Sequence, residues 1–335
     1  MSRVRPPKSH APADRTDEHA MRSKTTTFTV AAAAVLGIAT VMVASPASAE
    51  AASFRIAAHF DSAKGQTPEN IALGPDGTAY LTFSAARQVA AVSPHGAVRI
   101  LVTMPAPADG GVNTPVSKAA NTGGIVRTGN GTLYFLYDTG DADSTGLYRL
   151  RPGGTPHRIA ALPPTGLPNG LALDERTSTF YAADSVLGVV WTVPLSGGQA
   201  RVWVSAPELA RTAFLGANGI KVHDGAVWVS NLDQGTLLRI PVCHDGAGPV
   251  QVRVTGLGGI DDFAFDDAGD VLAALDGQNT VVRIGRDGRV TPFVDATNGV
   301  QNPTSVAVRG TIVYVLSAAF FGTDPNLLLA TLPSH

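Results

Sequence analysis

The sequence predicts an all-β fold, a six-bladed β-propeller with four-stranded blades, preceded by a secretory signal peptide. Three observations lead to this prediction. One pattern recurs six times along the chain, each repeat alternates apolar and polar residues, and turns rich in Gly and Asp separate the alternating runs. Period-two alternation between such turns is typical of β-hairpins. Four strands in a repeat of about 45 residues are typical of propeller blades.

Each repeat opens with a polar pair, continues as an apolar strand, turns, and returns as a second apolar strand. A third strand usually follows, and a fourth, outer strand is weaker. Equivalent apolar residues of the six first strands lie 54, 46, 49, 43 and 43 residues apart: Ile71, Ile125, Leu171, Ile220, Phe263 and Val306. Six such units fill one domain, 50–335. We expect the segment that starts at Phe54 to add an outer strand that closes the ring, and one turn of helix within 207–215.

The first 49 residues have a different character. Residues 21–24 (MRSK) are basic, residues 28–43 form an uncharged apolar run, and residues 47–49 (ASA) give the small-residue pattern that signal peptidase requires. We expect a leader and signal peptide over 1–49, cleaved after Ala49, with the true start at Met21, and a secreted, extracellular product. The alternative is a retained membrane anchor. Because the run of about 16 residues is shorter than the roughly 20 that span a bilayer, we expect no stable membrane anchor.

Composition and charge exclude several classes of protein. Of the 335 residues, 44% are hydrophobic and 16% are charged, which excludes a disordered chain and a coiled coil. The leader carries six basic and three acidic residues, so 19 basic and 24 acidic residues remain after cleavage, a net charge of −5. A mildly acidic protein repels a phosphate backbone, so we expect no nucleic-acid partner. The single cysteine, Cys243, excludes an intrachain disulfide. We expect a monomer.

Polar residues at the start of the first strands are the candidate site. The innermost strand of each propeller blade lines the central channel, so the residues at its start converge from all blades. In register these residues are Glu69, Gly123, Asn169, Asn218, Asp261 and Thr304. Two carboxylates and two carboxamides among them form an oxygen donor set suited to a divalent cation. The alternative is that Asn-Gly and Asp before a strand are ordinary turn residues.

A second polar set recurs at the end of the second strands: Asp138, Asp184, Asn231 and Asp276. We expect these residues to cap the blade turns, and the alternative is that they support the metal ligands. The sequence contains no G-x-S-x-G, H-E-x-x-H or phosphate-binding glycine motif. Chemistry at this site would therefore depend on a metal ion and water rather than on a nucleophilic side chain.

The motifs PEN with GPDGTAYLT, PNGLALD, ANGIKV and IDDFAFDDAGDV resemble the senescence marker protein/gluconolactonase family of six-bladed propellers. The resemblance implies one divalent cation, Ca²⁺ in the first place, with Zn²⁺, Mg²⁺ or Mn²⁺ as alternatives. By position, Glu69, Asn218 and Asp261 match the metal ligands. Asp261 also matches the general base, and Asn169 matches a residue that binds substrate or a metal-linked water.

Two departures separate this chain from the family pattern. The family motif Glu-Gly-Pro-x-Trp is replaced by Glu69-Asn70-Ile71-Ala72-Leu73. An Arg that often precedes the accessory Asn, and grips the oxygens of sugar acids, is also absent, because Leu167 and Pro168 stand there. Metal binding survives this comparison better than specificity for sugar lactones.

We therefore expect an exported, divalent-metal-dependent hydrolase of lactones or related esters, in which the metal activates water or polarises the carbonyl. The expected partner is a small-molecule lactone or ester. The alternative is a non-catalytic propeller similar to the NHL type, which binds a glycan or a protein. A third interpretation is a metal-free structural propeller.

Overall fold

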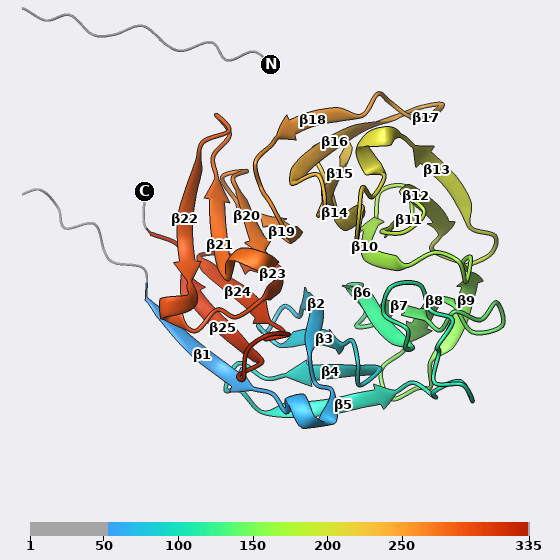
Figure 1. The fold of residues 1–335 in the computed structure, drawn as a ribbon, viewed down its shortest axis with the longest axis horizontal. Helices are drawn as coiled ribbons and strands as arrows, with labels where there is room; N and C mark the ends of the chain where they lie inside the picture. Colours follow the sequence, from blue (N-terminus) through green and yellow to red (C-terminus); the bar gives the residue numbers. More distant parts are fainter. Residues whose placement is uncertain (1–52, 334–335) are drawn as a thin grey trace, which may run out of the picture. The chain divides into compact units, whose positions relative to one another are not determined.

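The computed structural model describes residues 53–333, which form six antiparallel sheets around one central axis (Figure 1). The expected signal peptide and the two candidate start residues lie outside the described residues. No helix within 53–333 has the length and apolar character needed to cross a membrane.

The six sheets are the six blades expected from the repeats. From the inner to the outer strand they are β2 (Pro68–Leu73), β3 (Ala79–Phe83), β4 (Gln88–Val92) and β5 (Val98–Thr103); β6 (Asn121–Arg127), β7 (Leu133–Asp138), β8 (Gly146–Leu150) and β9 (His157–Ala161); β10 (Pro168–Asp174), β11 (Thr179–Asp184), β12 (Val189–Pro194) and β13 (Arg201–Ser205); β14 (Ala217–His223), β15 (Ala226–Asn231), β16 (Thr236–Cys243) and β18 (Gln251–Val254); β19 (Ile260–Phe265), β20 (Val271–Leu275), β21 (Thr280–Ile284) and β22 (Val290–Asp295); and β23 (Pro303–Arg309), β24 (Ile312–Ser317), β25 (Asn326–Thr331) and β1 (Phe54–His59).

Short elements supplement the blades. The fourth blade has a fifth strand, β17 (Gly246–Ala247), which pairs with the end of β16. Four 3₁₀ helices occupy loops of the described chain: η1 (Ser62–Lys64), η2 (Pro207–Leu209), η3 (Asp276–Gln278) and η4 (Ala296–Asn298). The helical turn expected within 207–215 is thus confined to η2. The part from 210 to 216 is irregular and carries the exposed Phe214.

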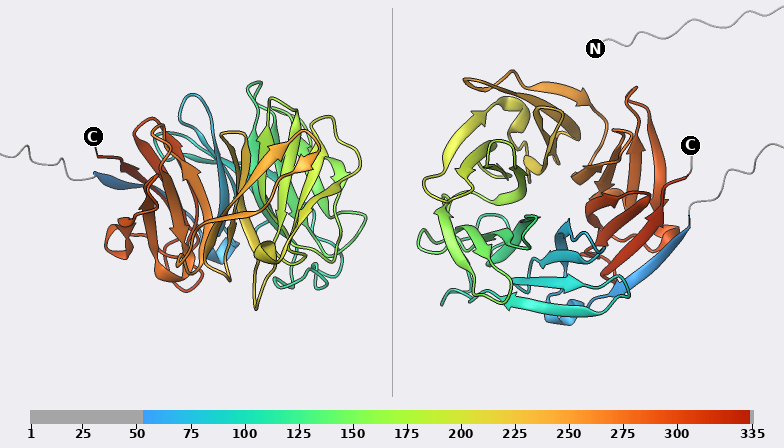
Figure 2. Two further views of the ribbon diagram at one scale, coloured as in Figure 1. Left: turned by 90° about the horizontal axis from the view of Figure 1, so that it is seen from above. Right: turned by 180° about the vertical axis from the view of Figure 1, so that it is seen from behind.

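The ring closes as expected from the sequence. Strand β1 pairs antiparallel with β25, with Phe54 opposite Ala330, so the start of the described chain completes the last blade. Each inner strand also contacts the inner strands of both neighbouring blades. Between the first and last blades, Thr304 donates a hydrogen bond of 3.0 Å to the carbonyl of Pro68. Closure is visible from both faces (Figures 1 and 2).

Apolar residues pack between adjacent blades, which explains the alternation in the sequence. One cluster joins Ile71 and Leu81 of the first blade to Leu316 and Leu327 of the last. Burial of such residues is the main favourable contribution to folding, so each blade depends on its neighbours for stability.

All six inner strands carry a β-bulge at the same place, and this bulge positions the candidate site. In the first blade Pro68 pairs with Phe83 and Ile71 pairs with Leu81, so one extra residue stands on the inner strand. The same shift recurs in the other five inner strands. Bulges re-aim side chains relative to a regular pleat. The polar pair of each repeat therefore lies inside the inner strand rather than in a turn before it.

The glycine after each site Asn has a packing role that the turn interpretation missed. A Cβ at Gly170 would lie 2.3 Å from the carbonyl oxygen of Asn218, and one at Gly219 would lie 2.6 Å from the Cα of Asp262. Neighbouring inner strands approach too closely there for any larger residue. Interpreting Asn-Gly as an ordinary turn is therefore wrong at both positions.

Candidate functional site

A cavity of about 410 Å³ lies where the bulged ends of the inner strands meet, and we call it the channel pocket. Its floor contains all four residues that the sequence singled out: Glu69, Asn169, Asn218 and Asp261. They come from the first, third, fourth and fifth blades. The structure thus brings these residues together, although it assigns them no role.

Each floor residue is the first residue of its bulge. Asn218 is fully buried and Asp261 is 8% exposed, whereas Glu69 and Asn169 keep more contact with the pocket. Gly123 and Thr304, the equivalents in the second and sixth blades, do not line the pocket. The six-fold register therefore yields a four-residue floor.

The floor residues form two acid–amide pairs. Asn218 Nδ2 donates a hydrogen bond of 2.9 Å to Asp261 Oδ1, and the Asn169 side chain donates to the carboxylate of Glu69. Ser185 Oγ also lies 3.4 Å from Asn218 Oδ1 as a weak donor. These contacts fix the carboxamides in place and leave carboxylate oxygens facing the pocket.

Crowded negative charge raises the pKa of both floor carboxylates. Burial, followed by the charges of Asp276 and Asp262, raises the pKa of Glu69 to about 8. Burial also raises the pKa of Asp261 well above its ordinary value, and the charges of Glu69, Asp276 and Asp262 add to this effect, against the influence of Lys221. Groups that resist ionisation in this way gain from a nearby cation.

Asp276 is a member of the site that the sequence did not place there. It lines the channel pocket, burial raises its pKa, and its buried Oδ1 has no hydrogen-bond partner. Its three counterparts behave as turn caps. Asp184 Oδ1, for example, accepts from the backbone N–H groups of Leu167 and Leu187, each at 2.9 Å. The recurrence at strand ends was visible in the sequence, but it gave no reason to separate Asp276 from the others.

Beneath the floor lies a buried network built from the second residues of the polar pairs. Asp262 Oδ1 accepts from Lys221 Nζ at 2.5 Å. Asp262 Oδ2 accepts from Ser305 Oγ at 2.6 Å and from Asn70 Nδ2 at 3.2 Å. These residues link four inner strands, and the ion pair compensates the charge of Asp262. The sequence pattern contained Asn70 and Asp262 as second members of a pair, but it did not identify this role.

The residues of the floor fit a hard divalent cation. Carboxylate and carboxamide oxygens are the donors that such ions prefer, and the unpartnered Oδ1 of Asp276 adds another. Within residues 53–333 no group of three or more His, Cys, Asp or Glu is arranged to hold a metal ion. A cation here would therefore depend on the carboxamides of Asn169 and Asn218 as well as on carboxylates.

Above the floor the walls are apolar. Leu167, which stands near the position of the family's Arg, lines the pocket together with Val116, Phe214, Phe320 and Phe321. Among the described residues, no Lys, Arg or His lines the pocket. The channel pocket therefore combines an anionic floor with a hydrophobic entrance.

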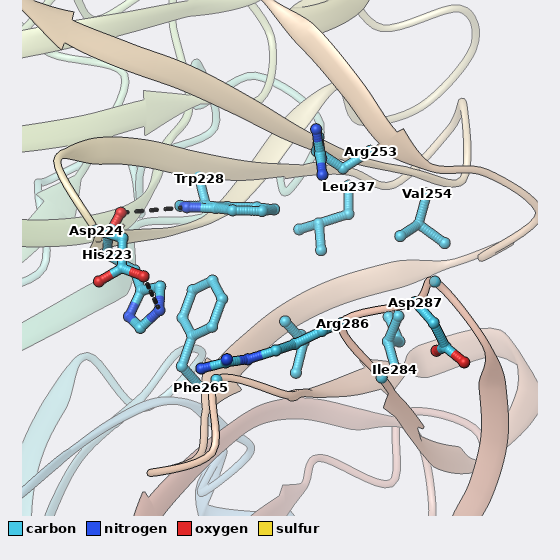
Figure 3. A pocket seen from close by; sticks show the side chains of 14 residues that line it. His223, Asp224, Trp228, Leu237, Arg253, Val254, Phe265, Ile284, Arg286 and Asp287 are labelled. Atoms are coloured by element: carbon cyan, nitrogen blue, oxygen red, sulfur yellow. Dashed lines mark hydrogen bonds and ion pairs between the residues drawn. The ribbon is translucent and has the colours of Figure 1, made fainter.

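A second hollow, of about 370 Å³, lies between the fourth and fifth blades (Figure 3). The His223 ring stacks on Phe265 with 3.8 Å between ring centroids, and the Trp228 indole N–H donates to the carbonyl of His223 at 3.3 Å. Arg253 and Arg286 flank this aromatic group, and both are exposed. None of the floor residues lies here, and the stacked rings account for the packing between the two blades.

Comparison with known proteins supports the family resemblance for part of the chain. Residues 120–254 match the family model described as SMP-30/Gluconolactonase/LRE-like region. No curated protein matches this sequence.

Solved structures show the same fold at low sequence identity. A gluconolactonase from Xanthomonas campestris is 14% identical, with a TM-score of 0.59 over 80% of this chain and 87% of that one. The calcium-binding protein regucalcin from Agrobacterium tumefaciens is 16% identical, with a TM-score of 0.60 over 83% and 94%. Virginiamycin B lyase from Staphylococcus aureus is 15% identical, with a TM-score of 0.57 over 80% and 82%. At these identities the likeness concerns the fold alone.

Proposed function

We propose, on the premise that residues 120–254 match the SMP-30/gluconolactonase family model, that this protein is an exported, divalent-metal-dependent hydrolase of lactones or related esters. The observation that carries the proposal is the convergence of Glu69, Asn169, Asn218 and Asp261 on one pocket floor. A propeller by itself does not specify an activity, so the proposal depends on this site.

Glu69, Asn218 and Asp261 would hold the cation, with Ca²⁺ as the first candidate. When bound, the cation would polarise the substrate carbonyl or lower the pKa of a water molecule. The ion pair between Lys221 and Asp262 lies directly behind Asp261 and holds this part of the inner strand in place. Asn169 stands beside Glu69, where its carboxamide can orient the substrate or a water.

Asp261 is the proposed base. Hydrolysis requires that a water oxygen bond to the carbonyl carbon, that the water proton be taken up, and that the ring C–O bond break. Asp261 would take the proton and return it to the departing oxygen, so that proton balance is maintained. Neutralisation of the floor by the cation would lower the pKa of Asp261 and leave it ionised for this step.

Elemental analysis combined with a panel of lactones and esters tests the proposal. Metal-stripped protein should lose hydrolysis, and added Ca²⁺ should restore it. Glu69→Gln should weaken metal binding. Asp261→Asn should remain inactive even when saturating Ca²⁺ restores occupancy, because the base is gone. Asp138→Asn, at a capping position away from the channel pocket, is the matched control and should bind metal normally.

A non-catalytic propeller, similar to the NHL type and binding a glycan or a protein, is the second candidate. Two observations favour it: the departure from the family's first motif and the lack of a cationic side chain among the described residues that line the channel pocket. Metal affinity that is unchanged in both Glu69→Gln and Asp261→Asn, with no hydrolysis by the wild-type protein, would place this candidate ahead.

A further inference from the structure

We infer that the channel pocket selects a lactone or ester with a large apolar substituent, alkyl or aryl, rather than a polyhydroxylated sugar lactone. This inference rests on the proposed function and specifies its substrate class. It depends on the wall and entrance of the pocket, which are independent of the floor residues that define the reaction.

Three phenylalanines at the entrance carry the inference. Phe214 is 55% exposed, Phe320 is 48% exposed and Phe321 is 93% exposed. They belong to two loops far apart in the sequence, β13–β14 and β24–β25, yet all three line the same cavity. Large apolar side chains gathered at the mouth of a pocket indicate a ligand surface, whereas single exposed apolar residues are ordinary.

Side-chain hydrogen bonds hold the loop of Phe214 in position. Asp233 Oδ2 accepts from the backbone N–H groups of Thr212, Ala213 and Phe214 at 2.8, 2.7 and 2.8 Å. A carboxylate that binds three consecutive N–H groups orders the backbone there. The exposed ring is therefore presented by an organised loop.

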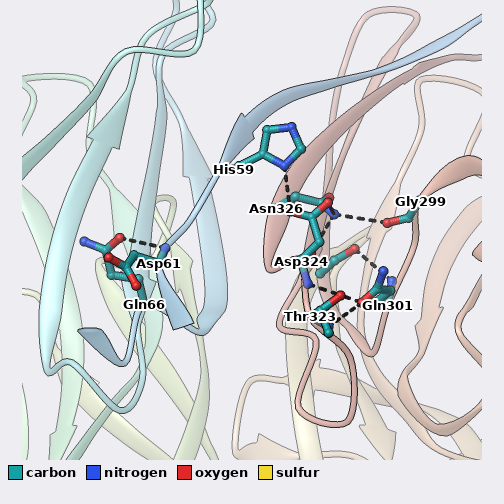
Figure 4. Close-up of polar contacts among 9 residues, drawn as sticks. His59, Asp61, Gln66, Gly299, Gln301, Thr323, Asp324 and Asn326 are labelled. Carbon is teal, nitrogen blue, oxygen red and sulfur yellow. Dashed lines mark hydrogen bonds and ion pairs between the residues drawn. The ribbon is translucent and has the colours of Figure 1, made fainter. Parts of the chain in front are cut away.

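The loop of Phe320 and Phe321 is held in a similar way (Figure 4). Gln301 Oε1 accepts from the N–H of Thr323 at 3.0 Å, and Asp324 Oδ1 lies 2.6 Å from His59 Nδ1. At the apex, Asn302 Oδ1 accepts from the N–H of Phe321 at 3.0 Å. Both loops thus combine an ordered backbone with apolar rings that stay exposed beside the pocket.

The polar groups of the wall are poorly suited to a sugar. Asn121 already donates to Ser117 Oγ at 3.1 Å and to the carbonyl of Ala119 at 3.3 Å. Leu167 stands near the position of the family's Arg, with 7% of its surface exposed. Hydroxyl groups facing Leu167 and the three rings would lose their hydrogen bonds to water without replacement, which is unfavourable. An alkyl or aryl group would instead bury these rings.

The test is a series of γ-lactones of increasing alkyl length, from γ-butyrolactone to γ-dodecalactone, with gluconolactone as the polar comparison, in the presence of Ca²⁺. We expect kcat/KM to rise about twofold to fourfold for each added methylene until the pocket is filled. The double variant Phe320→Ser/Phe321→Ser should flatten this dependence and leave γ-butyrolactone hydrolysis nearly unchanged. Phe54→Ser is the control, because Phe54 is 49% exposed on an outer strand. Its dependence on chain length should equal that of the wild type.

Binding of the corresponding γ-alkyl lactams, which resist hydrolysis, separates this inference from the proposed function. Lactam affinity that rises with chain length and falls in the double Phe variant supports the apolar pocket, even if no lactone is hydrolysed and the proposed function fails. A preference for gluconolactone overturns the inference and leaves the lactonase proposal standing. Lactam binding that is undetectable or independent of chain length also overturns the inference.

Discussion

Calcium binding to the channel pocket should be strongly pH-dependent, because the cation competes with protons for Glu69. The perturbation is a change of pH between 6 and 9 with metal-stripped protein. Burial and the neighbouring Asp276 and Asp262 charges raise the pKa of Glu69 to about 8 in the metal-free protein. A cation binds the ionised carboxylate, so affinity should increase as the pH rises and protons should be released on binding.

The magnitude follows from that pKa. About a hundredth of the Glu69 side chains are ionised at pH 6, about a tenth at pH 7 and about nine-tenths at pH 9. Calcium affinity should therefore rise about tenfold from pH 6 to 7, and about tenfold again from pH 7 to 9. The raised pKa of Asp261 makes this dependence steeper. At pH 7 the release should amount to about 0.9 proton per Ca²⁺ from Glu69 alone.

Calorimetric titration with Ca²⁺, in buffers that differ in ionisation enthalpy, measures both quantities. Glu69→Gln should lower the affinity and reduce the pH dependence to the contribution of Asp261. Asp138→Asn should retain the wild-type pH dependence. Affinity that is constant from pH 6 to 8 without proton release would refute the assignment of Glu69 as a ligand.

Three further predictions concern stability and processing. Burial, against hydrogen bonds from Gly140 and Thr145, raises the pKa of Asp138 from 3.8 to about 6. Its ionisation therefore destabilises the folded state progressively between pH 4 and 6, and Asp138→Asn should stabilise the protein by up to about 3 kcal/mol at pH 7 but not below pH 4. Denaturant unfolding at both pH values checks this, and an equal effect at both would contradict it. Gly170→Ala should destabilise by about 1–3 kcal/mol because its Cβ would lie 2.3 Å from the Asn218 carbonyl oxygen. Gly129→Ala, with no atom within 4 Å of the added Cβ, should be nearly neutral in the same thermal-unfolding assay. Secreted protein should begin at Glu50 by intact mass, and a mass that retains residues 21–49 would indicate a membrane anchor instead.

The sequence alone determined the architecture and the floor of the site, because both depend on a repeated pattern. Alternating strands and glycine-rich turns recur six times, and each repeat places its polar pair in the same bulge of an inner strand. Residues in register around a closed ring must converge on the axis. For this reason the register of the repeats is enough to assign Glu69 and Asp261, almost 200 residues apart, to one site.

Only the tertiary structure decided the features that break the repeat. Asp276 faces the channel pocket while its counterpart Asp184 caps a turn, because the loops after these strands differ and only some supply backbone N–H donors. The ion pair of Lys221 with Asp262 joins two neighbouring blades through side chains whose directions depend on the bulges. Phe214 and Phe321 meet above the floor because two non-repeating loops are tied down by hydrogen bonds of their own. Loop conformation depends on such individual contacts, which periodicity does not encode, so the sequence predicted where the site lies but not what surrounds it.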